Sequence, residues 1–154
     1  KWPNDIVVDG KKVCGILTEM SMEQGYIHHI VIGVGINVRR QEFPEEIRER
    51  AAAIDEQCGF CISRSQLIAD IMEAFEEDYE IFLQTHDLKG LRDSYAKLLL
   101  NQDREVCVLD PKGEYRGIAR GINDQGELIV EKQDGTVEEV YAGEVSVRGI
   151  YGYV

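Results

Sequence analysis

The spacing of the apolar residues changes near residue 100, and this change constrains the fold more than any other feature of the sequence. Before it, residues 67–83 carry apolar side chains every three or four positions, which predicts a long amphipathic helix. After it, short runs rich in Val and Ile are separated by turn signals such as Asp134-Gly135, at intervals of roughly 8–12 residues. That rhythm is typical of a small antiparallel barrel or meander. We therefore predict two domains, residues 1–101 and residues 102–154.

The residues before the long helix indicate an antiparallel sheet. Asp9-Gly10 stands between two strand-like runs, and it suits a tight hairpin because both central residues need a positive φ. A third run covers residues 26–38, and its nearly continuous apolar middle predicts burial on both faces. The fold class that follows is α+β, a mixed sheet with packed helices followed by a small β-barrel.

Three further local signals define the predicted helices. Pro44 and the two glutamates after it make a good first turn, so we expect a helix from Pro44 to Gly59. Ser63-Arg64-Ser65-Gln66 fits a capping box at the start of the long helix. Leucines between residues 88 and 99 indicate a shorter third helix.

Charge and composition exclude several classes of protein. The 154 residues include 17 Lys and Arg against 29 Asp and Glu, a formal charge of −12, so we expect no nucleic-acid partner. No apolar stretch approaches the roughly 18–20 residues that cross a bilayer, so we expect no membrane span. Four irregularly spaced cysteines do not suggest a disulfide-stapled secreted domain, and we expect a cytoplasmic protein. Because the chain begins with Lys1 and not with Met, we also expect it to be part of a longer protein.

The sequence does not predict a metal site. Cys58 and Cys61 have the spacing of a metal knuckle or a redox pair, but no second such pair supplies the other ligands. We favour reduced thiols in a turn between helices. His28 and His29 are adjacent on a predicted strand, so their rings point to opposite faces, and His86 falls at the end of the long helix.

The hairpin register predicts a charged pair. If Asp9-Gly10 is a two-residue turn, Val7 pairs with Lys12, and strict alternation puts Asp5, Lys12 and Cys14 on one face. A cation beside a carboxylate could stabilise a phosphate or a carboxyl oxygen. On spacing alone, an ordinary cross-strand ion pair is the favoured interpretation.

Three other segments allow two interpretations each. Gly33-Val34-Gly35-Ile36-Asn37 is not a dinucleotide fingerprint, because Val38 stands where the third glycine would fall. It either lets a ring lie against the backbone or marks a bulge or tight crossing. Trp2-Pro3-Asn4 suits a planar polar ligand or a strand cap, and the alternating Glu144, Ser146 and Arg148 suit a solvated face or a docking surface.

Four segments together resemble the ordered signatures of biotin–protein ligases. They are Lys1-Trp2-Pro3-Asn4-Asp5, Lys12-Val13-Cys14-Gly15-Ile16-Leu17, Gly33-Val34-Gly35-Ile36-Asn37-Val38 and Gly143-Glu144-Val145-Ser146-Val147-Arg148. Each is weak alone, but their order and spacing are specific. The resemblance spans the whole chain and covers the later half of the family's catalytic region plus its C-terminal domain. It implies a partial class II synthetase-like domain followed by an SH3-like domain.

The resemblance also implies a reaction and its residues. Biotin and ATP, with Mg²⁺, give biotinyl-5′-AMP and pyrophosphate, and biotin then passes to a lysine of a biotin carboxyl carrier protein domain. Lys12 and Asp5 match the catalytic positions. Biotin-binding positions match Lys12, Gly15, Leu17, Gly33 and Ile36, and nucleotide-binding positions match Asn4, Asn37, Glu144 and Arg148.

Two alternatives stay open. One is a non-catalytic interaction module with an SH3-like barrel, and the other is a related acyl-adenylate ligase for a different acid. The Gly/Arg-rich loop of the family has no counterpart in this sequence, so we expect this chain alone to ligate poorly or not at all. An open sheet edge and unshielded apolar surface favour a homodimer.

Overall fold

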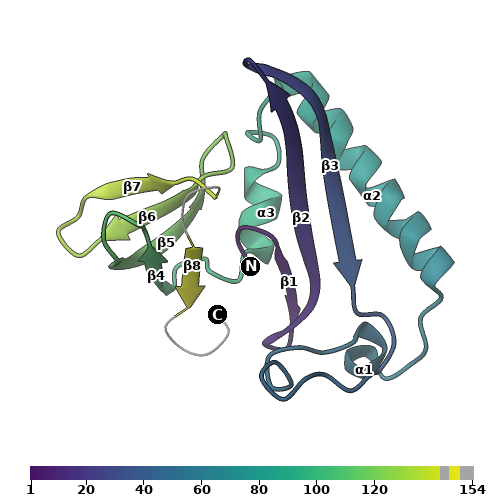
Figure 1. The fold of residues 1–154 in the computed structure, drawn as a ribbon. Helices are drawn as coiled ribbons and strands as arrows, with labels where there is room; N and C mark the ends of the chain where they lie inside the picture. Colours follow the sequence, from purple (N-terminus) through teal and green to yellow (C-terminus); the bar gives the residue numbers. More distant parts are fainter. Residues whose placement is uncertain (143–145, 150–154) are drawn as a thin grey trace. The chain divides into compact units, whose positions relative to one another are not determined.

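A computed structural model describes residues 1–142 and 146–149 of the chain (Figure 1). Its contacts divide the chain into two units, a hairpin unit of residues 4–62 and a second unit of residues 1–3 and 63–154. The hairpin unit contains β1 (Asp5–Val8), β2 (Lys11–Glu23), β3 (Tyr26–Ile36) and α1 (Ile54–Cys58). The second unit contains α2 (Arg64–Thr85), α3 (Arg92–Leu98), β4 (Glu105–Leu109), β5 (Tyr115–Ile122), β6 (Leu128–Lys132), β7 (Val137–Val140) and β8 (Ser146–Gly149). The α+β fold class is confirmed.

The predicted hairpin forms at Asp9-Gly10, with φ of 47° and 77°, and Val7 pairs with Lys12 as expected. The register then shifts, so that Cys14 pairs with Ile6 and Gly15 pairs with Asp5. Val13 is therefore an extra residue, a β-bulge that changes which side chains share a face. The expectation that Cys14 stands on the face of Asp5 was wrong, because Gly15 takes that position.

β3 pairs with β2 along its whole length, but its burial differs from the expectation. Residues 26–35 are all exposed, and the side chain of Ile32, in the middle of the apolar run, is 60% exposed. β1 pairs only with the first residues of β2, so much of the β2–β3 pair is a two-stranded ribbon within this unit. The predicted burial of both faces is therefore absent from the described part of the chain.

The segment after β3 also differs from the prediction of a helix starting at Pro44. Only α1 is α-helical there, and it ends at Gly59, whose φ is 76°. The backbone of the preceding loop instead bonds to Lys12: Lys12 N donates to Arg50 O at 2.8 Å, and Ala52 N donates to Lys12 O at 3.0 Å. These long-range bonds satisfy backbone groups that a helix would have used, and they override the local helical signal.

The long helix was predicted correctly. α2 follows Ser63, whose hydroxyl oxygen accepts a hydrogen bond from Gln66 N at 3.4 Å, and it ends at His86. Its apolar stripe is exposed in the structure, with Phe75 about half exposed. None of the helices in the described part of the chain combines the length and the apolar character that crossing a bilayer requires.

The strands of the second unit form one antiparallel sheet in the order β7-β6-β5-β4-β8. Its inward side chains alternate along each strand and make a fully buried core, to which β4 contributes Val106 and Val108 and β6 contributes Leu128 and Val130. Trp2, far away in sequence, belongs to the same core. Among the described residues β7 and β8 remain the two edges, so closure into a barrel stays a prediction, as does the domain boundary between residues 101 and 102.

The close packing around Gly117 lets us predict how a substitution there affects stability. A Cβ at Gly117 would lie 2.5 Å from Val130 Cγ1 and 2.6 Å from Glu131 O. Gly117→Ala should therefore lower the free energy of unfolding by about 1–3 kcal/mol through overpacking. Urea unfolding followed by the fluorescence of Trp2, the single tryptophan, measures this. The exposed neighbour variant Arg116→Ala should change it by less than about 0.5 kcal/mol, and equal effects of the two variants would contradict the account.

Candidate functional site

The centre of the candidate site is the ion pair of Lys12 and Asp5. Lys12 Nζ lies 2.5 Å from Asp5 Oδ1, and the carboxylate side chain is only 13% exposed. Gly15 faces this pair, because a Cβ there would lie 2.9 Å from Lys12 Nζ and 3.0 Å from Lys12 Cε. The ammonium thus occupies the space that a side chain at position 15 would need. The predicted contact between Lys12 and Asp5 is confirmed.

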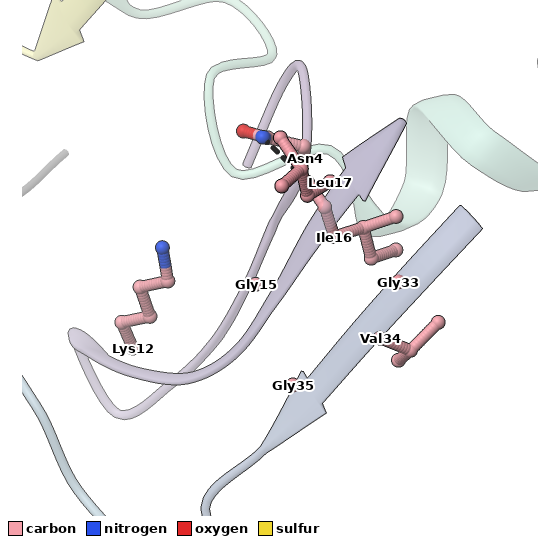
Figure 2. A pocket seen from close by; sticks show the side chains of 8 residues that line it. All are labelled: Asn4, Lys12, Gly15, Ile16, Leu17, Gly33, Val34 and Gly35. Atoms are coloured by element: carbon pink, nitrogen blue, oxygen red, sulfur yellow. Dashed lines mark hydrogen bonds between the residues drawn. The ribbon is translucent and has the colours of Figure 1, made fainter. Parts of the chain in front are cut away.

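An open hollow lies beside this pair (Figure 2). It has a volume of about 520 Å³, within the usual size of small-molecule sites. It is lined by Asn4, Lys12, Gly15, Ile16, Leu17, Gly33, Val34 and Gly35. Its polar groups are therefore those of Asn4 and Lys12 together with the peptide groups of the strands.

The glycines leave strand backbone uncovered in this hollow. The register pairs Gly15 with Gly35 and Leu17 with Gly33, so these four residues share one face of the hairpin. A Cβ at Gly33 or Gly35 would meet nothing closer than 3.8 Å or 3.7 Å, and neither residue has a positive φ. The pairing is regular here, so the structure does not support a bulge or tight crossing. Packing within the unit therefore does not require Gly33 or Gly35, and their missing side chains leave the backbone of β3 uncovered in the hollow.

Asn4 is fixed at the rim of the hollow by two hydrogen bonds to one residue. Its backbone oxygen accepts from Ile16 N at 2.9 Å, and its Nδ2 donates to Ile16 O at 2.7 Å. Figure 2 shows the side chain at this rim with the second of these bonds. The carboxamide oxygen and the second amide hydrogen take no part in the bond to Ile16 O, so their positions are set while their bonding capacity is retained.

Three predicted residues of the hairpin unit lie outside this lining: Asp5, which contacts Lys12, and Ile36 and Asn37. Ile36 pairs with Cys14, and alternation turns its side chain to the face opposite Gly35. Asn37 follows the end of β3, where its Oδ1 accepts from Gln41 Nε2 at 3.5 Å and its backbone oxygen accepts from Ile54 N at 2.8 Å. It therefore holds the start of α1.

The two predicted residues of the last strand cannot be placed relative to the hollow. Glu144 lies outside the described residues. Arg148 is described only by its backbone, which pairs with Cys107 in the second unit. Their predicted nucleotide-binding roles stay predictions.

The sequence interpretation missed Gly35, Ile16 and Val34 as lining residues. The Gly-x-Gly spacing was the available signal for Gly35, but only the strand register shows that it stands opposite Gly15. Of the two interpretations of Trp2-Pro3-Asn4, contact of Trp2 with a planar ligand is wrong, because the indole is buried in the core of the second unit.

The cysteines and histidines form no metal site in the part of the chain that the structure describes. Cys58 and Cys61 are free and exposed on either side of the turn that follows α1, as favoured from the sequence. His28 Nε2 lies 3.2 Å from Glu23 Oε2, an exposed contact within the β2–β3 ribbon.

The charged pair affects the pKa of the neighbouring Cys14 thiol. Burial raises the pKa of the Cys14 thiol, while the Lys12 ammonium lowers that pKa and the Asp5 carboxylate raises it. Desolvation is the largest of the three causes because it disfavours the thiolate.

Comparison with known proteins shows which family the chain resembles. Two family models match the chain. The model described as "Biotin/lipoate A/B protein ligase family" matches residues 1–37, and the model described as "Biotin protein ligase C terminal domain" matches residues 103–148. These matches define a protein of the biotin and lipoate ligase class. Within that class, the chain belongs to the biotin protein ligase family.

Relatives and solved structures extend the comparison to nearly the whole chain. A bifunctional ligase/repressor BirA of Bacillus spizizenii is 37% identical over 152 residues, which cover 96% of this chain and 45% of the relative. The apo biotin protein ligase of Aquifex aeolicus is 29% identical with a TM-score of 0.81, covering 96% of this chain and 63% of that one. The same enzyme in complex with biotin and ATP is 28% identical with a TM-score of 0.78, over 96% and 60%. This chain spans about half the length of the curated relatives that it matches.

The pKa of Cys14 provides a test of the charged pair. Lys12→Met removes a cation that lowers this pKa, so the thiol should ionise at higher pH and alkylation at a given pH should slow. Asp5→Asn removes an anion that raises it and should have the opposite effect. The measurement is the rate of alkylation by iodoacetamide against pH, with the other three cysteines replaced by serine. Lys11→Met is the matched control. Shifts of the Cys14 pKa in the same direction in Lys12→Met and Asp5→Asn would contradict the geometry.

Proposed function

We propose that this chain carries the activation site of a biotin–protein ligase. In the proposed reaction, an oxygen of the biotin carboxylate attacks the α-phosphorus of ATP, which forms biotinyl-5′-AMP and releases pyrophosphate. A lysine amine of a carrier protein then attacks the acyl carbon, which forms the amide and releases AMP. The observation that carries this proposal is the Lys12 ammonium, which is held by Asp5 at the edge of an open hollow with uncovered strand backbone.

The position of Lys12 suits both steps. In the first step, negative charge from two anionic reactants comes together, and a fixed ammonium stabilises the transition state more than a mobile one. In the second, the leaving AMP phosphate gains charge, and the same ammonium can offset it. The role proposed for Asp5 is to orient Lys12, since its carboxylate lies at contact distance and is largely buried.

The hollow supports the proposed binding of biotin. Biotin has a compact bicyclic ring system, an alkyl chain and a terminal carboxylate. In the proposed complex the ring system lies against the peptide groups at Gly15 and Gly33, with Leu17 beside it. The carboxylate end would then face Lys12, and the free polar atoms of Asn4 would face the adenylate. Ile36 points to the other face in this structure, so its proposed contact with biotin is the one that the register does not support.

Fewer of the predicted nucleotide-binding residues than of the predicted biotin-binding residues lie at the hollow. We extend the proposal to Asn37, Glu144 and Arg148, on the basis of their motif positions. The described residues contain no cluster of three acidic, His or Cys side chains suited to a metal ion. In this proposal Mg²⁺ enters as the counter-ion of ATP, which is its usual state in nucleotide sites.

Several predictions about partners belong to the same proposal. The biotin carboxyl carrier protein domain is the proposed acceptor, and a homodimer and a cytoplasmic location remain predictions. The large exposed apolar side chains of β2 and β3 are the feature that supports self-association.

Biotin is the favoured acid, and lipoate is the second candidate because the family description that matches residues 1–37 includes both. Lipoate also carries a ring, an alkyl chain and a carboxylate, so the same lysine could assist its activation. An exchange assay with each acid in turn separates the two.

Lys12→Met in the full-length gene product should reduce biotin-dependent exchange of pyrophosphate into ATP by about 10²–10³-fold, the usual effect of losing one electrostatic contact to the transition state. The exchange of labelled pyrophosphate measures the first step alone. Lys11→Met changes the same charge at the neighbouring position, where strand alternation turns the side chain to the opposite face, and it should retain activity.

Three outcomes would count against the proposal. Equal activity of Lys12→Met and the unchanged protein would show that Lys12 takes no part in the reaction. Equal loss in both lysine variants would indicate a general effect of charge. Exchange that depends on lipoate and not on biotin would assign the other acid.

A further inference from the structure

Trp2 is anchored in the second unit by polar contacts as well as by packing. Its side chain is only 3% exposed and belongs to the core of the five-stranded sheet. The indole Nε1 donates to Gly126 O at 3.0 Å, and the backbone N of Trp2 donates to Asn101 Oδ1 at 3.2 Å. The indole bond fixes the side chain, as is usual for a buried tryptophan, and the bond from the backbone N fixes the main chain at Trp2 as well.

Asn101 is unusual in this core. Its side chain is fully buried, and it is the one buried polar residue among the described residues. Its Oδ1 accepts the bond from Trp2, whereas its Nδ2 has no hydrogen-bond partner in the described structure. Burying an unpaired amide nitrogen costs free energy, and the bond from Trp2 to Oδ1 offsets part of this cost.

The residues that follow Trp2 enter the candidate site. Only Pro3 lies between Trp2 and Asn4, and the proline ring fixes its own φ. Asn4 is bonded twice to Ile16, and Asp5 pairs with Gly15 and contacts Lys12. The same short segment is thus held at Trp2 in one unit and at Asn4 and Asp5 in the other.

We propose that Trp2 and Asn101 are positioning residues for the site, because the buried hydrogen bonds of Trp2 hold the segment from which Asn4 and Asp5 reach Ile16 and Lys12. Their effect passes along the backbone through Pro3. Without the anchor, the bonds of Asn4 to Ile16 and the contact of Asp5 with Lys12 open more often. The inference about positioning stands on geometry alone, whereas its consequence for catalysis rests on the proposed function.

The amide of Ile16 reports this effect directly, because its hydrogen is bonded to Asn4 O. Hydrogen exchange measured by NMR should be about tenfold faster at Ile16 in Trp2→Ala than in the unchanged chain, since a lost tether raises the population of the locally open state. The amide of Asn37, which donates to Val13 O in the same unit, should keep its rate.

Val130→Ala is the matched control. Val130 is fully buried in the same core as Trp2, but it lies far from the Trp2-Asn4 segment in sequence. If Trp2 were only a core residue, both variants would leave Ile16 unchanged or would affect it equally, and either result overturns the inference. Should Trp2→Ala fail to fold, Trp2→Phe removes the indole N–H and its five-membered ring but keeps an aromatic side chain in the core, and it should give a smaller acceleration at Ile16 in a folded chain. No acceleration there would equally overturn the inference.

Activity separates this inference from the proposed function. In the full-length gene product, Trp2→Ala should reduce biotin-dependent pyrophosphate exchange at least fivefold, Trp2→Phe should restore part of it, and Val130→Ala should retain it. Faster exchange at Ile16 without any biotin-dependent activity in the unchanged protein would leave the anchor intact and refute the proposed function. Normal activity of Trp2→Ala despite faster exchange at Ile16 would refute the catalytic consequence of the anchor.

Discussion

The contact between the Lys12 ammonium and the Asp5 carboxylate depends on an irregularity of the hairpin. The turn fixes the pairing of Val7 with Lys12, and the bulge at Val13 then brings Gly15 opposite Asp5. Because Gly15 has no side chain, the long Lys12 side chain can fold over it toward the carboxylate. A regular strand would have placed the Cys14 side chain there instead. The geometry of the site thus follows from one extra residue and one missing side chain.

Long-range backbone bonds support the same residue from the other side. Lys12 N and Lys12 O bond to Arg50 and Ala52, which fixes the backbone from which the ammonium extends. Ala52 itself is almost completely buried, as are Val13 and Ala53, which adjoin Lys12 and Ala52 along the chain. An ion pair whose lysine side chain is 37% exposed contributes little to stability, which agrees with the proposal that Asp5 orients Lys12.

Features set by neighbouring residues could be predicted from the sequence, and features set by distant contacts could not. The Asp9-Gly10 turn, the Ser63 cap and the stripe of α2 depend on local chemistry, and all three are confirmed. The loop that pairs with Lys12 and the burial of Trp2 depend on partners far away in sequence. The spacing of apolar residues does not predict such contacts. The Lys12–Asp5 pair was predictable because the turn sets the register as far as Lys12, before the bulge intervenes.

The most direct test of the central claim is a crystal structure of the full-length gene product with a non-hydrolysable analogue of biotinyl-5′-AMP. We expect Lys12 Nζ within about 3.2 Å of an oxygen of the acyl-phosphate linkage, with the bicyclic ring against the backbone at Gly15 and Gly33. A ligand bound on the opposite face of the hairpin, or a Lys12 ammonium that contacts Asp5 alone while the ligand lies elsewhere, would contradict the account.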